Sequence, residues 1–302
     1  MTRLLIAAYA ACCLAACGGG ASAPAGDGTG IVNIAITDAA VDSVSVVMVE
    51  FTGVELKAKN GENVVEIFDS PKSIDLLELQ DGRTEELLPD TRVDAGEYNW
   101  IRLAVNAEVD NIRNSYVITE TGEEVELGIP SGSQSGLKLV SGFTVTQNGA
   151  TNLVIDWDLR KALSNPTGQP GMHLRPALRI TDMAMYGTLR GTVAEALTMA
   201  DECGEDSSVG NAVYLYEGTV DTPMDIRAAE TDPVATATVA ADLGYSISYL
   251  SPGDYTAAFT CHANLDDTAA DAIDEIVFSV VDTEVTIVDG ETTVLDFAAL
   301  TM

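Results

Sequence analysis

Apolar and polar residues alternate with a period of two along most of the chain after residue 30. The clearest alternating runs are 31–37, 44–51, 98–105, 115–119, 137–145 and 153–159. Gly, Asn, Asp and Pro separate these runs, and short helical turns are expected only around 73–79, 159–164 and 268–276. Because strands follow one another without intervening helices, the pattern predicts an all-β fold of antiparallel β-sandwiches.

A domain boundary is expected near Tyr186. One series of strands ends with the run 174–181, and another opens with the stretch 187–193. Residues 31–186 and 187–302 each have the length of an ordinary domain. We therefore predict two β-sandwich domains in tandem.

The N-terminus has the features of an export signal. Arg3 precedes a short apolar run at 4–14, which is too short to span a bilayer as a helix but fits a signal peptide. The run ends in Leu14-Ala15-Ala16-Cys17, which resembles the lipobox of bacterial lipoproteins. The resemblance implies that residues 1–16 are removed and that Cys17 is lipidated; an ordinary signal peptide with Cys17 as a free thiol is the alternative.

The same resemblance indicates a destination. Gly18, where Asp would favour retention in the inner membrane, implies release to the outer membrane of a Gram-negative cell, on its periplasmic or its external face. Residues 18–30 are rich in Gly, Ala, Ser, Pro and Thr. This composition is typical of a flexible linker with an end-to-end distance of roughly 20 Å, so residues 17–30 are expected to tether the body to the membrane.

The charge of the chain limits its partners. A formal net charge of -32 disfavours nucleic acid and anionic lipid surfaces, so the lipid rather than a basic patch has to anchor the protein. Acidity of this kind is usually a solvated surface, and divalent cations are the small partners that it favours.

Two of the five cysteines remain available after processing. Cys12 and Cys13 leave with the signal, so Cys203 and Cys261 are expected to form a disulfide in an oxidising compartment. A nucleophile made by Cys261 and the adjacent His262 is the alternative. Neighbouring side chains on a strand point to opposite faces, which disfavours it.

The disulfide would also bring acidic residues together. Around Cys203 these are Asp201, Glu202, Glu205 and Asp206, and beyond Cys261 they are Asp266 and Asp267. Crowded carboxylates repel one another unless a cation bridges them, and Ca²⁺ takes oxygen ligands. We expect either a Ca²⁺ site or two solvated loops here, and no other cofactor.

The run 98–105 offers a candidate binding face. Strand alternation places Tyr98, Trp100 and Arg102 on one face, outside the core if the more apolar face is buried. Aromatic side chains beside a cation would suit stacking on a glycan, whereas a loop or the second domain could equally cover this face. Trp157 is expected in the core.

Catalytic signatures are sparse. The chain has only His173 and His262 as histidines, and it lacks the common nucleophile-elbow and phosphate-loop motifs. Asp156 and Asp158 share one face of the run 153–159 and could mimic a glycosidase couple, although an exposed polar face explains them as well.

Two stretches resemble known families. Blocks in consistent order resemble the bacterial lipoprotein family with domain of unknown function 4382: VNIAITDAAVD at 32–42, VEFTGVEL at 49–56, residues 76–88, AGEY at 95–98, IRL at 101–103, SGLKL at 135–139 and DWD at 156–158. YSISYLSPGDYT at 245–256, with GTV at 191–193, is similar to the carboxypeptidase regulatory-like (transthyretin-like) sandwich. The first resemblance implies a β-rich fold without an assigned activity. The second implies a non-catalytic spacer or interaction unit.

The expected function is therefore a non-catalytic binding or adhesion module of the outer membrane, not an enzyme. Its partners would be the membrane, through the lipid, and an unknown protein or glycan, with Ca²⁺ assisting if the acidic loops bind it. The alternative function is a structural or assembly accessory to other envelope proteins, and a hydrolase is the third possible function.

Overall fold

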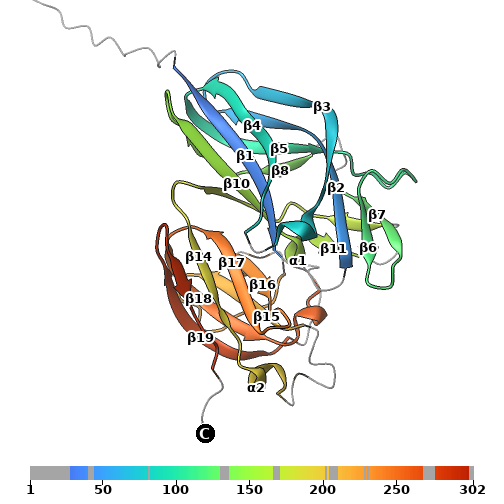
Figure 1. Cartoon of the computed structure of the whole chain (residues 1–302), viewed down its shortest axis with the longest axis vertical. Helices are drawn as coiled ribbons and strands as arrows, with labels where there is room; N and C mark the ends of the chain where they lie inside the picture. Colours follow the sequence, from blue (N-terminus) through green and yellow to red (C-terminus); the bar gives the residue numbers. More distant parts are fainter. Residues whose placement is uncertain are drawn as a thin grey trace, which may run out of the picture.

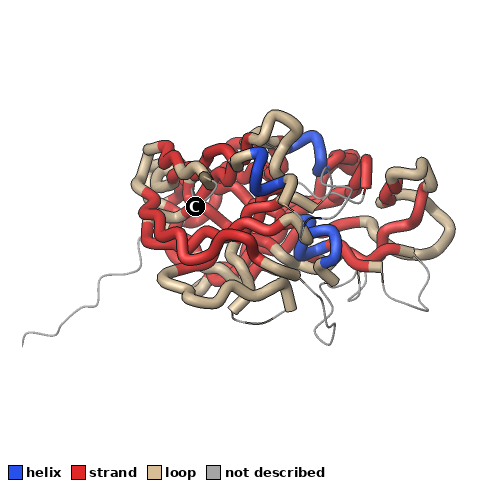
Figure 2. Tube along the Cα trace, turned by 90° about the horizontal axis from the view of Figure 1, so that it is seen from below, coloured by secondary structure: helices blue, strands red, loops and turns tan. Residues whose placement is uncertain are grey.

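The computed structural model describes residues 28–39, 44–80, 82–129, 136–165, 171–200, 203, 210–227, 229, 231–267 and 276–298. Figure 2 shows strand through most of this part of the chain, with only short helices. The short helices are η1 (Leu76–Leu79), α1 (Leu159–Ala162), α2 (Glu195–Thr198) and η3 (Ala263–Leu265). The predicted all-β fold is confirmed. No helix in the described ranges combines the length and the apolar character needed to cross a bilayer.

Two sheets form the first group of strands. The smaller has the order β13 (Leu178–Asp182), β10 (Ala150–Asp158), β1 (Thr29–Ala39), β4 (Glu85–Asp94). The larger runs β11 (Leu163–Ser164), β12 (Met172–Leu174), β7 (Glu124–Gly128), β6 (Tyr116–Thr119), β2 (Val44–Ala58), β5 (Gly96–Val105), β8 (Leu137–Leu139), with β3 (Val64–Asp75) on β2 and β9 (Phe143–Val145) on β5. We call β1–β13 the first domain.

Two further sheets make up the rest. One has the order β17 (Gly244–Leu250), β14 (Gly187–Thr192), β20 (Thr292–Val294). The other has the order β16 (Ala235–Thr238), β15 (Ala212–Glu217), β18 (Gly253–Thr260), β19 (Phe278–Ile287). We call β14–β20 the second domain, which forms the lower half of the molecule in Figure 1. The boundary expected near Tyr186 falls between β13 and β14, and its exact position stays a prediction.

Most strand pairs are antiparallel, as predicted, but some are parallel. β1 pairs in parallel with β10, from Ile31 opposite Ala150 to Ala39 opposite Asp158. β12 with β7 and β14 with β20 are parallel as well. The N-terminal strand therefore lies inside its sheet, between β10 and β4.

Each domain buries its own apolar core. In the first domain the inner faces of both sheets meet around Trp157, which is fully buried and packs edge-on against Phe51 with ring centroids 6.4 Å apart. The prediction that Trp157 belongs to the core is confirmed. In the second domain Phe259, Tyr245 and Phe297 lie in the main core. A smaller cluster around Tyr214 and Tyr216 lies apart from it.

Candidate functional site

Buried charges lie where β10 ends against the second domain. Asp156 and Asp158 lie at the end of β10 on the face opposite Trp157, and Arg160 follows in α1, which lies between the two groups of strands in Figure 1. All three side chains are buried. The exposed polar face expected for Asp156 and Asp158 is therefore wrong, because the second domain covers this end of the strand. We call the contact region between the two domains the seam.

Asp158 links the two domains through one carboxylate oxygen. Its Oδ1 caps α1 by accepting from the Lys161 backbone N–H at 3.3 Å, and it also accepts from Thr236 Oγ1 of the second domain at 3.2 Å. Burial raises the pKa of Asp158, with Asp156 adding to the effect and Lys161 and Arg160 opposing it. The carboxylate thus serves as a helix cap and as a contact between domains.

The two basic residues of α1 reach into the second domain. Arg160 donates to Thr238 Oγ1 at 3.0 Å and to the Ala263 carbonyl at 3.2 Å. Lys161 Nζ donates to the Pro233 carbonyl. Backbone carbonyls and hydroxyls thereby compensate cations that would be costly to bury alone.

Strand β13 covers the edge of β17. Arg179 pairs with the buried Asp156 and donates to the Ser248 carbonyl at 3.2 Å. Thr181 Oγ1 donates to the Tyr249 carbonyl at 2.7 Å, and the Tyr249 hydroxyl donates back to the Gly82 carbonyl at 2.8 Å. Tyr249 has a φ of 55°, which is uncommon for an aromatic residue. Its two hydrogen bonds to the first domain hold this conformation in place.

A cleft opens beside the seam. Its volume is about 690 Å³, within the range of small-ligand sites, which favour domain interfaces. Hydroxyl, carboxylate and amide groups and the guanidinium of Arg190 line it, and its polar members are Asp38, Gln80, Arg190, Thr192, Thr236, Thr238, Asp242, Tyr245, Ser246 and Asp296. A separate cavity of about 30 Å³ lies between Asp158 and Tyr249, enough room for about one water molecule.

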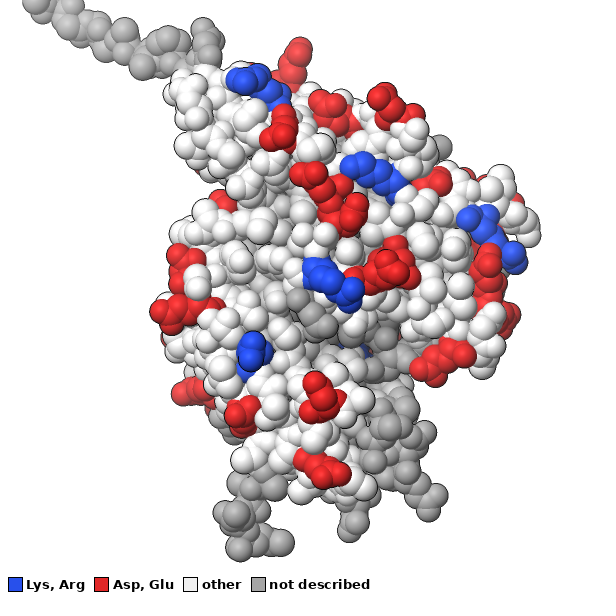
Figure 3. Space-filling view, viewed as in Figure 1, with Lys and Arg blue, Asp and Glu red and all other residues white. Residues whose placement is uncertain are grey.

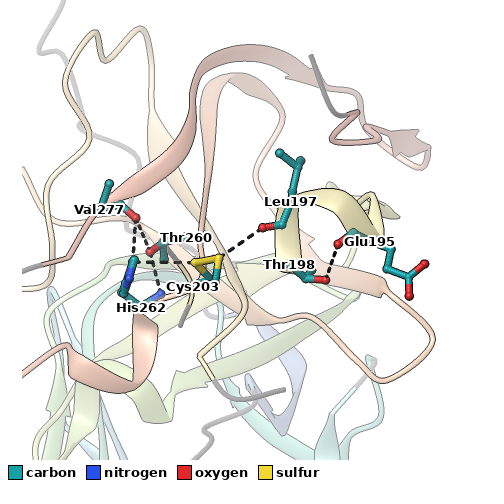
Figure 4. The surroundings of a disulfide bond; sticks show 8 residues. Glu195, Leu197, Thr198, Cys203, Thr260, His262 and Val277 are labelled. Carbon is teal, nitrogen blue, oxygen red and sulfur yellow. Dashed lines mark hydrogen bonds between the residues drawn. A yellow bond between two sulfur atoms is a disulfide. The ribbon is translucent and has the colours of Figure 1, made fainter. Parts of the chain in front are cut away.

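The predicted disulfide is present. Cys203 and Cys261 are bonded, with their Cα atoms 5.5 Å apart. In Figure 4, His262 lies next to the disulfide, where its backbone N–H donates to Thr260 Oγ1 at 3.0 Å and its Nδ1 lies 3.4 Å from the Val277 carbonyl. Because the Cys261 sulfur is bonded to Cys203, it offers no thiolate for the alternative Cys-His nucleophile.

The acidic residues expected around this disulfide are only partly described. Asp201, Glu202, Glu205 and Asp206 lie outside the described residues, as does Cys17. Asp267 is exposed, but Asp266 points inward and accepts from the Tyr214 hydroxyl at 2.6 Å. Within the described ranges no group of three or more His, Cys, Asp or Glu residues is arranged to hold a metal ion. The Ca²⁺ site stays a prediction.

Burial changes the acidity of Asp266. Its Oδ2 also accepts from the Ile226 backbone N–H at 3.4 Å. Desolvation raises the pKa of the carboxyl group to about 6, although both hydrogen bonds and the charge of Arg160 oppose the shift. Asp266 is therefore a titrating group near neutral pH rather than an open ligand on a loop.

The expected placement of Tyr98 is wrong. Its side chain is only 3% exposed, its ring stacks on Phe143 at 4.9 Å and its hydroxyl donates to the Asp94 carbonyl at 2.9 Å. Lys57 pairs with Trp100 while the next residue, Ala58, pairs with Tyr98, so Asn99 has no opposite residue. This β-bulge reverses the alternation and turns Tyr98 into the core.

Trp100 and Arg102 do lie on the outer face. Arg102 forms an ion pair with Glu55 at 3.0 Å. The Arg102 guanidinium carbon lies 5.0 Å, and Lys138 Nζ 4.7 Å, from the centre of the Trp100 ring. The indole is thus half-buried among cations, and Tyr98 is not its partner.

Comparison with known proteins identifies part of the chain. Residues 29–176 match the family model described as Domain of unknown function (DUF4382). A DUF4382 domain is therefore present at residues 29–176. This confirms the DUF4382 domain of the first resemblance, whereas its lipoprotein character and the transthyretin-like second domain stay predictions. The DUF4382 domain comprises β1 to β12 and includes Asp158 and Arg160, which face the seam. Curated proteins gave no match.

Solved structures show only distant likeness. The Bacillus anthracis TIE protein is 13% identical over 89% of this chain and 34% of TIE, with a TM-score of 0.21. GBS52, the minor pilin of Streptococcus agalactiae, is 11% identical over 88% of this chain and 94% of the pilin (TM-score 0.21). BcpA, the major pilin subunit of Bacillus cereus, is 10% identical over 89% of this chain and 69% of BcpA, with a TM-score of 0.22. The chain spans about a third of TIE, and such scores do not indicate a shared overall arrangement.

Proposed function

We propose that this protein is a lipid-anchored, non-catalytic binding module of the bacterial cell envelope, attached through Cys17 to the outer membrane. The seam cleft is its ligand site, and a polar, hydroxyl-rich ligand such as a glycan is the class that fits the lining. Ca²⁺ bound by the acidic loops around the disulfide would assist by ordering them.

The cleft is the observation that carries the proposal. Its walls combine the guanidinium of Arg190, the carboxylates of Asp242 and Asp296 and several threonine and serine hydroxyls. Such convergent donors and acceptors suit the hydroxyl groups of a sugar. The charges of Asp156, Asp158, Arg160 and Arg179 are engaged in contacts at the seam, which gives them a structural role and supports a binding rather than a hydrolytic function.

The surface charge is consistent with a solvated, exported body. Figure 3 shows acidic side chains spread over both domains on the visible face, with few basic ones among them. This supports a solvated body that meets neutral ligands more readily than anionic polymers.

Glycan-array binding tests the ligand site. Wild-type protein is expected to bind one or more neutral glycans, and Arg190→Ala is expected to lose at least tenfold in affinity because a charged hydrogen-bond donor is removed. Arg92→Ala, an exposed arginine on β4, is the matched control. Equal binding by all three proteins would exclude the cleft as the ligand site.

Fractionation of cells tests the anchor independently. Native protein is expected in the outer-membrane fraction and Cys17→Ser in the soluble envelope fraction. Protease treatment of intact cells then separates the two faces of the membrane. Degradation favours adhesion at the surface. Protection favours a periplasmic accessory role.

A further inference from the structure

The outer face of β3, β2, β5 and β8 carries an apolar and basic surface patch. Cross-strand pairing places its members side by side: Glu55 lies opposite both Val65 and Arg102, and Arg102 lies opposite Lys138. The residues two positions along each strand extend the same face. We define the outer patch as Val65, Ile67, Trp100, Arg102, Lys138 and Val140.

The aliphatic members are unusually accessible. Val65, Ile67 and Val140 are 57%, 78% and 79% exposed. A single exposed aliphatic side chain needs no explanation, but several on the sheet face that also carries a tryptophan are typical of an interaction surface.

Around Trp100 the charge of this face is opposite to that of the chain. Lys57, Arg102 and Lys138 supply three positive charges against the carboxylate of Glu55, and Glu97 further along β5 is paired with Lys59 at 2.6 Å, whereas the whole chain has a formal charge of -32. Glu55 is occupied by Arg102 at 3.0 Å, and Lys57 donates to Asn63 at 2.8 Å. Lys138 lies over the Trp100 ring. The outer patch therefore complements an anionic partner that also offers apolar contact.

The outer patch lies near the start of the folded body. The Ala95 backbone N–H donates to the Gly28 carbonyl at 2.8 Å, which fixes Gly28 beside the first residue of β5. Trp100 is four residues further along this strand, about 13 Å away. Cys17 precedes Gly28 by eleven residues, so covalent geometry limits their separation to about 40 Å. A lipid on Cys17 would hold the outer patch close to the membrane.

We propose that the outer patch docks the folded body onto the lipid surface in which the Cys17 anchor is inserted. Trp100 would lie at the level of the headgroups, Arg102 and Lys138 would contact lipid phosphates, and the aliphatic side chains would enter the boundary of the acyl region. This inference rests on the lipid anchor proposed above.

The anchor makes weak docking sufficient. Because the lipid already holds the protein at the membrane, docking is an intramolecular step with a high effective concentration. Anionic headgroups repel the acidic remainder of the surface, so the body turns the outer patch toward them. The negative net charge opposes binding of an unanchored protein to an anionic membrane. In the anchored protein the same charge helps to orient the body on that membrane.

Tryptophan fluorescence of the lipidated full chain tests the proposal. The chain has two tryptophans and Trp157 is fully buried, so contact quenching by bilayer lipids reports Trp100. The protein is reconstituted into vesicles of phosphatidylcholine and phosphatidylglycerol that contain brominated acyl chains. We expect quenching in the wild type, none in Trp100→Phe, and clearly less in Ile67→Ser and Lys138→Gln.

Matched controls lie away from the outer patch. Val294→Ser on β20, where the valine is 62% exposed, and Arg92→Gln on β4 are expected to be quenched like the wild type. Equal loss of quenching in these controls would overturn a specific role for the outer patch.

Flotation separates failure of docking from failure of the anchor. Protein that does not float with vesicles lacks the lipid, and both proposals then fail. Protein that floats without quenching keeps the anchor and overturns docking. If such protein also sediments as a dimer that Ile67→Ser converts to a monomer, the outer patch is covered by a second copy instead.

Discussion

At the scale of single residues, Asp266 has the best-defined chemical behaviour. Its Oδ2 accepts both of its hydrogen bonds, from Tyr214 and Ile226, inside a largely apolar cluster. Because burial raises its folded-state pKa to about 6, the carboxyl group favours the folded state when it is protonated. This contribution to stability is present at low pH and is lost as the pH rises through 6.

Replacement of Asp266 by Asn is therefore expected to stabilise the protein at neutral pH. The amide oxygen of Asn can accept both hydrogen bonds, and no charge has to be buried. We expect a gain on the order of 1 kcal/mol at pH 7.5, or roughly 2–4 °C in Tm, that vanishes near pH 4. Thermal melting between pH 4 and 8 measures it, with the exposed Glu62→Gln as control. A constant difference across this range would contradict the assignment.

Single residues also show where sequence reasoning stops. Trp157 was placed correctly because its apolar neighbours at 153, 155 and 159 share its face. The position of Tyr98 was predicted wrongly, because Asn99 has no opposite residue and shifts the alternation by one position. Nothing in the local sequence pattern indicates this bulge. The burial of Asp156 and Asp158 depends on the second domain, which an isolated strand pattern does not include.

At the scale of elements, strands with strict alternation were predictable and the irregular ones were not. The runs 31–37 and 44–51 lie within β1 and β2, and the run 153–159 lies within β10 except for Leu159, which begins α1. Strand β3 contains Asp69, Ser70 and Pro71, which read as a turn. β3 pairs with β2 on both sides of these residues, from Met48 opposite Asp75 to Phe51 opposite Lys72 and from Gly53 opposite Ile67 to Leu56 opposite Val64. Residues 68–71 have no partner on β2, so the turn-like residues mark a bulge within the strand rather than its end.

The disulfide is the element-scale feature most open to test. It joins the chain after α2 to the end of β18 across 58 residues, so the reduced chain gains considerable freedom when it unfolds. A Cys203→Ala, Cys261→Ala double variant is expected to lose about 4 kcal/mol of stability in the chain-entropy model. Urea unfolding measures this loss, and the wild type under reducing conditions should match the variant. Unchanged unfolding midpoints would contradict a stabilising role.

At the scale of the whole molecule, the seam makes the two domains interdependent. Its contacts run in both directions: Asp158, Arg160, Arg179 and Thr181 bind the second domain, and Tyr249 binds the first. Several of these groups are buried charges, which are expensive to leave without partners. Separation of the two domains would leave these charged groups without their partners. Because this is costly, the domains are expected to unfold together in a single transition.

Arg179→Leu tests this coupling. The substitution leaves the buried Asp156 carboxylate without its cation and is expected to cost about 3–5 kcal/mol. Asp156→Asn combined with Arg179→Leu should recover part of the loss, because no uncompensated charge remains. Differential scanning calorimetry should show one transition for the wild type and two for Arg179→Leu. A single transition at the wild-type temperature would mean that the seam is energetically minor.

The parallel pairing of β1 with β10 has a consequence for how the chain folds. Ile31 lies opposite Ala150, so the first strand cannot complete its sheet until about 120 further residues have been delivered. Closing so large a loop is entropically costly, and non-local pairings of this kind slow folding. Until β10 is available, the apolar side chains of Val32, Ile34 and Ile36 lack the cover of that strand. The first strand of the chain is thus among the last to be secured, and this interval is when the incomplete chain is most prone to aggregate.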